Sequence, residues 1–82
     1  MIPPPSAGGA HGRGRGYVYL LRSRLDGTFY VGWTTDLMRR LVEHNAGSSG
    51  FTRRKIPWQL IEVETHSTVE EAKARERTLK RH

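Results

Sequence analysis

The chain has 82 residues, with 14 lysines and arginines against eight aspartates and glutamates, and a formal net charge of +6. This length allows one domain, and the lack of cysteine excludes disulfide bonds and thiolate zinc sites. The surplus of positive charge favours a polyanionic partner, most commonly nucleic acid, although a merely basic protein is the alternative. No apolar run reaches the roughly 7–15 residues of a signal peptide core or the ~20 of a membrane helix. We therefore expect a cytoplasmic protein with no membrane partner.

The first part of the chain is poor in apolar side chains. Residues 1–16 contain Pro3-Pro4-Pro5 and five glycines. Such a segment cannot bury enough surface to offset the entropy lost on ordering. We predict a disordered N-terminal arm over residues 1–16, followed by one domain over residues 17–82.

Two aromatic, β-branched segments flank Asp26-Gly27, a strong hairpin signal. A tight two-residue turn there would place Arg22 opposite Val31, and would separate Tyr19 from Tyr30 by about four residues, or ~13 Å along the strand. The two tyrosines would still share one face of the hairpin. The predicted core face is the other one, which carries Val18, Leu20, Phe29, Val31 and Trp33. The tyrosine face also carries Tyr17, Leu21 and Gly32.

A helix is predicted next, capped by Thr34 or Thr35, with Asp36 in its first turn and Asn45-Ala46-Gly47 at its end. On a helical wheel the apolar residues form one stripe, and Arg40 and His44 are i, i+4 neighbours on its edge. The predicted buried stripe comprises Leu37, Met38, Leu41 and Val42.

The last third of the chain predicts a loop over residues 47–57, a third strand over residues 58–65 and a final helix capped by Ser67 or Thr68. The strand alternation puts Trp58, Leu60 and Glu62 on one face, and Gln59, Ile61 and Val63 on the other. In the helix, Glu76 falls inside the apolar stripe between Lys73 and Lys80, where a carboxylate needs a partner. The order β-β-α-β-α predicts an α+β fold with a three-stranded antiparallel sheet flanked by helices.

These residue types suit phosphodiester hydrolysis. That reaction needs a base for water, a cation for the charge that develops on the phosphate, and usually a metal. A protected carboxylate suits Mg²⁺, and the planar fork of an arginine suits phosphate. Each residue also has a structural reading: tyrosines pack on sheets, arginines pair on surfaces, and Glu76 can pair with Lys73 or Lys80. Only their joint occurrence favours a site.

Five positions resemble the signature of the GIY-YIG endonuclease superfamily, and most closely its small single-domain bacterial branch. The first motif reads Tyr17-Val18-Tyr19 and the second Tyr30-Val31-Gly32. The family's helix arginine and histidine fall on Arg40 and His44, and its metal-binding glutamate falls on Glu76. The resemblance covers the chain from about Gly16 to its end.

The resemblance implies that Glu76 binds one divalent ion, Mg²⁺ or Mn²⁺, and that Tyr19 activates water as a base. Tyr30 and Arg40 would hold the scissile phosphate, and His44 would contact phosphate or relay a proton. Gly32 would allow close approach at the hairpin. A nucleic-acid-binding set is also expected: Gly32, Thr52, Arg53, Arg54 and Lys55.

The expected function is hydrolysis of DNA phosphodiesters, with branched or damaged DNA as substrate and a role in repair or recombination. The 82 residues contain no separate DNA-recognition domain, so we expect a protein partner that supplies specificity. Two alternatives stay open: a non-catalytic nucleic-acid-binding module on the same scaffold, and a protein-interaction module whose basic face meets an acidic partner.

Overall fold

The structure is a computed structural model that describes residues 14–81. Three strands, β1 (Gly16–Ser23), β2 (Phe29–Thr34) and β3 (Trp58–His66), form one antiparallel sheet in the order β2-β1-β3. Helix α2 (Leu37–Asn45) follows β2, a 3₁₀ turn η1 (Thr52–Lys55) precedes β3, and helix α3 (Val69–Leu79) follows β3. The predicted α+β fold and its element order are confirmed.

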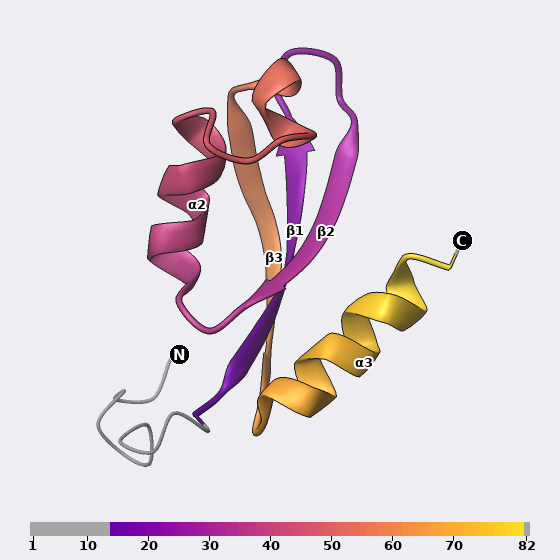
Figure 1. Cartoon of the computed structure of the whole chain (residues 1–82). Helices are drawn as coiled ribbons and strands as arrows, with labels where there is room; N and C mark the ends of the chain where they lie inside the picture. Colours follow the sequence, from indigo (N-terminus) through magenta and orange to yellow (C-terminus); the bar gives the residue numbers. More distant parts are fainter. Residues whose placement is uncertain (1–13, 82) are drawn as a thin grey trace.

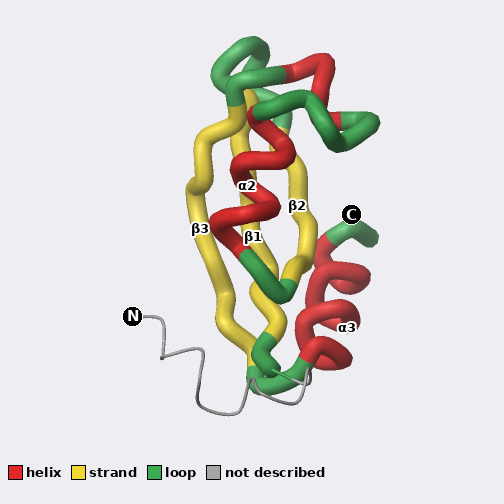
Figure 2. The backbone as a smooth tube through the Cα atoms, turned by 60° about the vertical axis from the view of Figure 1, so that its left-hand side comes forward, coloured by secondary structure: helices red, strands yellow, loops and turns green. Residues whose placement is uncertain are grey.

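The two helices cover opposite faces of the sheet (Figure 1). On one face, Leu37 and Leu41 of α2 pack against a core formed by Tyr19, Leu21 and Trp58. On the other face, α3 packs obliquely beside β1 and β2, and its C-terminal end lies next to β2 (Figure 2). Residues projecting from β2 and β1 can therefore meet side chains from both helices.

The hairpin register differs from the predicted one by two residues. Arg22 pairs with Phe29, Leu21 with Tyr30, and Tyr19 with Gly32. The tight two-residue turn was wrong because the hydroxyl of Ser23 accepts the backbone N–H groups of Leu25 and Asp26, which lengthens the loop. Since the change is an even number of residues, the tyrosines still share a face, but their stagger shrinks from four residues to two.

The predicted core face was also wrong in part. The larger core lies on the tyrosine face, and Phe29 on the opposite face is 58% exposed. In α2, Met38 and Val42 were predicted to be buried but are exposed, whereas His44 is fully buried. The buried stripe is thus centred on Leu37, Leu41 and His44, because the helix turns its Arg40–His44 edge toward the tyrosines.

Strand β3 departs from simple alternation. The pairing with β1 is irregular between Leu20 and Leu21, where Leu20 pairs with Glu62 but Leu21 pairs with Leu60. Ile61 is the extra residue, as in a β-bulge. Past this point the faces exchange, so Val63 joins the core with Leu60 although the alternation had separated them.

The cap predictions need small corrections. Asp36, rather than Thr34 or Thr35, caps α2, and its carboxylate accepts the N–H of Arg39 at 3.1 Å. Gly47 follows the helix with φ +82°, a left-handed conformation that suits glycine at a helix end. Thr68 caps α3 as one of the two predicted candidates.

The structure describes only the last residues of the predicted arm. Residues 1–13 of the predicted arm lie outside the described residues. Gly16, however, is the first residue of β1 and is buried. A Cβ atom at this position would lie 2.5 Å from the Cβ atom of Ala72 in α3. The missing side chain of Gly16 therefore lets α3 approach β1 closely.

Replacing Gly16 by alanine is expected to lower the free energy of unfolding by about 1–3 kcal/mol, because the added methyl group overpacks this contact. Urea denaturation measures the loss. Combining Gly16→Ala with Ala72→Gly should return part of that stability, since the second change removes the clashing atom. If the double variant instead loses the sum of the stabilities lost by the two single variants, the contact between residues 16 and 72 is not the cause.

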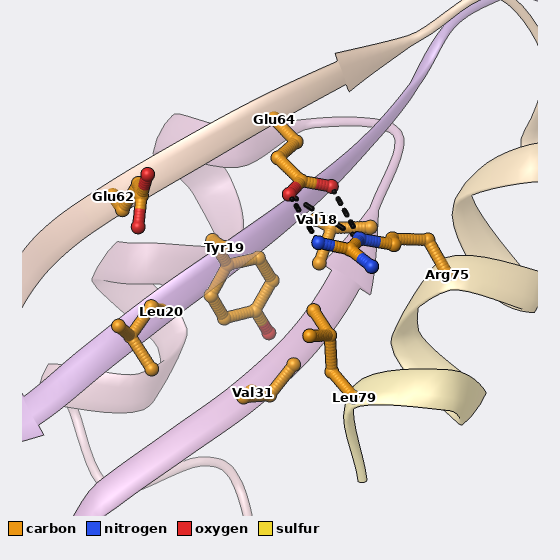
Figure 3. A pocket seen from close by; sticks show the side chains of 8 residues that line it. All are labelled: Val18, Tyr19, Leu20, Val31, Glu62, Glu64, Arg75 and Leu79. Atoms are coloured by element: carbon orange, nitrogen blue, oxygen red, sulfur yellow. Dashed lines mark hydrogen bonds and ion pairs between the residues drawn. The ribbon is translucent and has the colours of Figure 1, made fainter.

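A shallow hollow of about 230 Å³ remains on the α3 face of the sheet (Figure 3). Two of its three charged side chains are paired with each other: Arg75 binds Glu64 through Nε and Nη2 at 3.0 and 3.1 Å, which ties α3 to β3, and Glu62 is the third. Because this pairing occupies the guanidinium of Arg75, the hollow is a weaker candidate for chemistry than the tyrosine face.

Within residues 14–81, no helix is long and apolar enough to cross a membrane.

Candidate active site

Three aromatic rings from β1, β2 and α2 meet on the tyrosine face. The ring centroids of Tyr19 and Tyr30 are 6.4 Å apart, and the His44 ring lies 5.7 Å from Tyr19 and 5.1 Å from Tyr30. The two-residue stagger brings the tyrosines together, as the predicted four-residue stagger would not. Gly32 makes room for this arrangement, because a Cβ atom there would lie 2.4 Å from the Tyr19 hydroxyl oxygen.

A buried hydrogen-bond chain runs through the cluster. The Tyr19 hydroxyl lies 2.8 Å from Nε2 of His44, and Nδ1 of His44 lies 2.7 Å from Oγ1 of Thr52. The hydroxyl of Thr52 also donates to the carbonyl oxygen of Ser49 at 3.4 Å. His44 and Thr52 are each 0% exposed and Tyr19 is 2% exposed. The chain is therefore shielded from water along most of its length.

Burial sets the protonation states of this chain. It raises the pKa of Tyr19 to about 12; the neighbouring Arg40 guanidinium opposes the rise, and the negative charge of Glu76 adds to it. Burial, with the positive charge of Arg40, lowers the pKa of His44 to about 4. Near neutral pH the protein therefore holds a neutral phenol against a neutral imidazole.

The stability of the protein is expected to fall as the pH decreases from about 6.5 to about 4. An unfolded chain protonates His44 below about pH 6.5, whereas the folded protein resists until about pH 4, so acid favours unfolding in this window. The loss should total roughly 3 kcal/mol. Urea denaturation between pH 7 and pH 5, where the carboxylates stay largely ionised, measures the larger part of it, about 2 kcal/mol. A wild-type slope equal to that of His44→Gln would contradict the assignment.

Arg40 and Glu76 bring opposite charges to the cluster from α2 and α3. Arg40 is partly buried, and its guanidinium binds Glu43 at 2.9 Å and the Ser49 hydroxyl at 3.2 Å. Glu76 has only 17% of its side chain exposed and pairs with Lys80 at 2.8 Å. The ammonium of Lys80 also lies 5.2 Å from the centre of the Tyr30 ring. The wheel thus placed both Arg40 and Glu76 correctly toward the protein interior.

The donor set near Glu76 fits Mg²⁺ better than zinc. Within the described part of the chain, no three His, Cys, Asp or Glu side chains gather as a metal site. Zinc prefers three or four such ligands, whereas Mg²⁺ accepts one carboxylate and keeps several waters. Oε2 of Glu76 is paired with the ammonium of Lys80 at 2.8 Å, so one positive charge already lies against this carboxylate.

The residues expected to bind nucleic acid separate into two groups. Arg53 and Arg54 of η1 are exposed, and their side chains make no ion pair within residues 14–81. Lys55 is tied to the hairpin loop by an ion pair with Asp26. The side chain of Thr52 is buried against His44, which corrects the expectation that it contacts nucleic acid, and Gly32 is buried as well.

Comparison with known proteins identifies the domain. The family model of the GIY-YIG catalytic domain matches residues 15–82. The chain belongs to the GIY-YIG family. Members of this superfamily are nucleases, generally dependent on divalent metal and acting on DNA.

Relatives of this GIY-YIG domain come from bacteria and archaea. It is 43% identical over 68 residues to a UPF0213 protein of Streptococcus pneumoniae, covering 82% of this chain and 68% of the relative. It is 42% identical over 65 residues to a UPF0213 protein of Halobacterium salinarum, covering 78% and 83%. A solution NMR structure of a UPF0213 protein from Bacillus halodurans is similar, with a TM-score of 0.53 and 35% identity, covering 83% of this chain and 72% of that one.

Sequence reasoning on the GIY-YIG motifs missed two neighbours of the cluster. Ser49 binds Arg40, and Phe51 stacks on Tyr30 with ring centroids 6.2 Å apart. The pairing of Glu76 with Lys80, one of its two expected partners at helical spacing, is confirmed. Ser49, Phe51 and the buried position of Thr52 depend on how the loop after α2 folds back, for which the sequence carries no periodic signal.

Proposed function

We propose that this GIY-YIG domain is a divalent-metal-dependent endonuclease that hydrolyses DNA phosphodiester bonds. The observation that carries the proposal is the convergence of Tyr19, Tyr30 and His44, with ring centroids 5.1–6.4 Å apart, beside the charges of Arg40 and Glu76. A structural core has no need for a phenol, an imidazole, a guanidinium and a carboxylate from four elements at one point. We further propose that it acts in the cytoplasm, in DNA repair or recombination, with a protein partner that supplies specificity.

Each residue of the cluster has a proposed role. Arg40 and the Tyr30 hydroxyl bind the oxygens of the scissile phosphate and stabilise the charge that develops there. Arg53 and Arg54, which are exposed beside the cluster, bind the DNA backbone. Glu76, which Lys80 now pairs with, would hold the divalent cation. One Mg²⁺ or Mn²⁺ ion on Glu76 would supply positive charge that polarises the phosphate and lowers the pKa of the nearby phenol.

The proton of the attacking water passes to Tyr19 as the Tyr19 proton passes to His44. A free phenolate is costly here, because burial holds the pKa of Tyr19 near 12. Transfer of both protons together avoids it, since Nε2 of His44 lies 2.8 Å from the hydroxyl. The imidazolium that forms is itself disfavoured by burial and by Arg40, so His44 releases its proton to solvent once the reaction is complete. The water oxygen forms the new bond to phosphorus. The electron pair of the broken P–O bond leaves on the sugar oxygen, which takes a proton from solvent.

The experiment is a cleavage assay on linear, nicked and branched DNA with Mg²⁺ or Mn²⁺. Wild type should cleave at least one of these substrates and should lose activity in EDTA. Glu76→Gln should be inactive with either metal. Glu70→Gln, which removes an exposed carboxylate from the first turn of the same helix, should match wild type. Equal cleavage by Glu76→Gln and wild type would contradict the role given to Glu76.

A non-catalytic nucleic-acid-binding module is the second candidate, favoured by the net charge of +6 and the exposed Arg53 and Arg54. It predicts strongly salt-dependent binding and no cleavage with any metal. Under this alternative, Arg53→Ala with Arg54→Ala should weaken DNA binding while Glu76→Gln leaves it unchanged.

A further inference from the structure

The hydroxyl of Thr52 occupies a position that fixes the chemistry of His44. Oγ1 of Thr52 lies 2.7 Å from Nδ1 of His44, and both side chains are fully buried. The backbone around Thr52 is itself held in place. Its carbonyl oxygen accepts the indole N–H of Trp58 at 2.8 Å, and Trp58 belongs to the core. Thr52 is therefore a rigid partner of the imidazole.

The available donors and acceptors determine which groups donate in the hydrogen-bond chain that joins Tyr19, His44 and Thr52. The guanidinium of Arg40, which only donates, lies beside the phenol oxygen of Tyr19. If Nε2 of His44 also donated to that oxygen, the phenol proton would have no acceptor within residues 14–81. The phenol must therefore donate to Nε2, and a neutral imidazole that accepts at Nε2 carries its proton on Nδ1.

The other end of the chain agrees with this direction. The hydroxyl of Thr52 can give its proton to the carbonyl oxygen of Ser49 at 3.4 Å, which leaves its lone pairs for Nδ1–H of His44. Every proton in the chain then has an acceptor. The reverse direction leaves the buried phenol proton without an acceptor in the described part of the protein, which is unfavourable.

We infer that Thr52 is a positioning residue that holds His44 in the Nδ1–H tautomer, so that Nε2 faces Tyr19 as the acceptor of its proton. The tautomer follows from the hydrogen-bond chain alone; its catalytic consequence rests on the proposed function. Thr52 accepts the same N–H group when His44 is neutral and when it is protonated. It thus supports the imidazole before and after proton transfer, as the orienting partner of a general base does.

The first test needs no DNA. Long-range ¹H–¹⁵N NMR spectra of the wild-type protein should show His44 protonated at Nδ1 and bare at Nε2. Thr52→Ser, which keeps the hydroxyl, should show the same tautomer. Thr52→Val has nearly the same shape but no acceptor, so the proton should move to Nε2 in most molecules. A wild-type imidazole protonated at Nε2 would overturn the inference even if Thr52→Val fails to fold.

The second test concerns the rate. Thr52→Val should lower kcat on a cleaved DNA substrate by roughly 10²-fold, the usual contribution of a working acid–base group. KM should stay unchanged, because the buried side chain cannot touch DNA, and Thr52→Ser should recover most of the rate. A rise in KM without loss of kcat would instead make Thr52 part of the DNA surface. If wild type cleaves no DNA, the proposed function fails while the tautomer assignment stands on its spectra.

Discussion

Replacing Tyr19 by phenylalanine is expected to lower kcat for DNA cleavage by about 10²–10⁴-fold, with little change in KM. The substitution removes one hydroxyl oxygen, and with it both the acceptor for the water proton and the donor to His44 at 2.8 Å. The ring itself remains to pack against Leu21 and Trp58. Single-turnover cleavage at saturating DNA measures the effect on the chemical step.

The matched control for this substitution is Tyr17→Phe. It removes the same atom from the same strand and the same face, two residues away and outside the hydrogen-bond chain. It should cleave at the wild-type rate. Tyr19→Phe also leaves Nε2 of His44 buried without a donor, at a cost of about 1–3 kcal/mol, so the assay belongs well below the unfolding temperature. Wild-type kcat in Tyr19→Phe would remove Tyr19 from the mechanism.

Gly32→Ala is expected to lower both stability and activity, although glycine and alanine differ by one methyl group. The new Cβ atom would lie 2.4 Å from Oη and 2.6 Å from Cζ of Tyr19. Because the phenol is buried and bonded to His44, it can yield only by leaving that hydrogen bond. We expect a loss of about 1–3 kcal/mol in the free energy of unfolding and, from misplacement of the base by about 1 Å, a loss of roughly 10² in kcat.

Gly50→Ala is the matched control for Gly32→Ala, because a Cβ atom at Gly50 meets nothing within 4 Å. Urea denaturation and single-turnover cleavage on the three proteins separate the effects. Gly50→Ala should behave as wild type in both. If Gly32→Ala cleaves at the wild-type rate, the position of the Tyr19 phenol does not limit the reaction.

The helical parts of the site could be predicted from the sequence. A wheel places Arg40 and His44 on the edge of the apolar stripe of α2, and Glu76 inside that of α3. The structure confirms that Arg40 and Glu76 are partly buried, whereas His44 is fully buried in the stripe itself. The wheel failed for Met38 and Val42, which are exposed. The reason is that packing against the sheet decides which side of α2 is buried, and the periodicity of apolar residues alone does not identify the middle of that side.

The strand and loop parts of the site could not be predicted. The hairpin register depends on which backbone N–H groups donate to the Ser23 hydroxyl. Which side chains of β3 face the core depends on the irregularity at Ile61. Neither leaves a periodic signal in the sequence. The partnership of Thr52 with His44 depends on how the loop after α2 returns over the cluster, so a residue that looked like part of a basic surface became part of the buried chain.

Single-turnover cleavage in H₂¹⁸O tests the central claim most directly. In this account Tyr19 serves as a base and water attacks phosphorus. Wild type with Mg²⁺ should therefore place one ¹⁸O atom on the terminal phosphate that each cleavage forms, and no DNA should stay attached to the protein after denaturation. Unlabelled product phosphate with DNA covalently bound to a tyrosine would contradict the account, as would DNA binding without cleavage at any metal concentration.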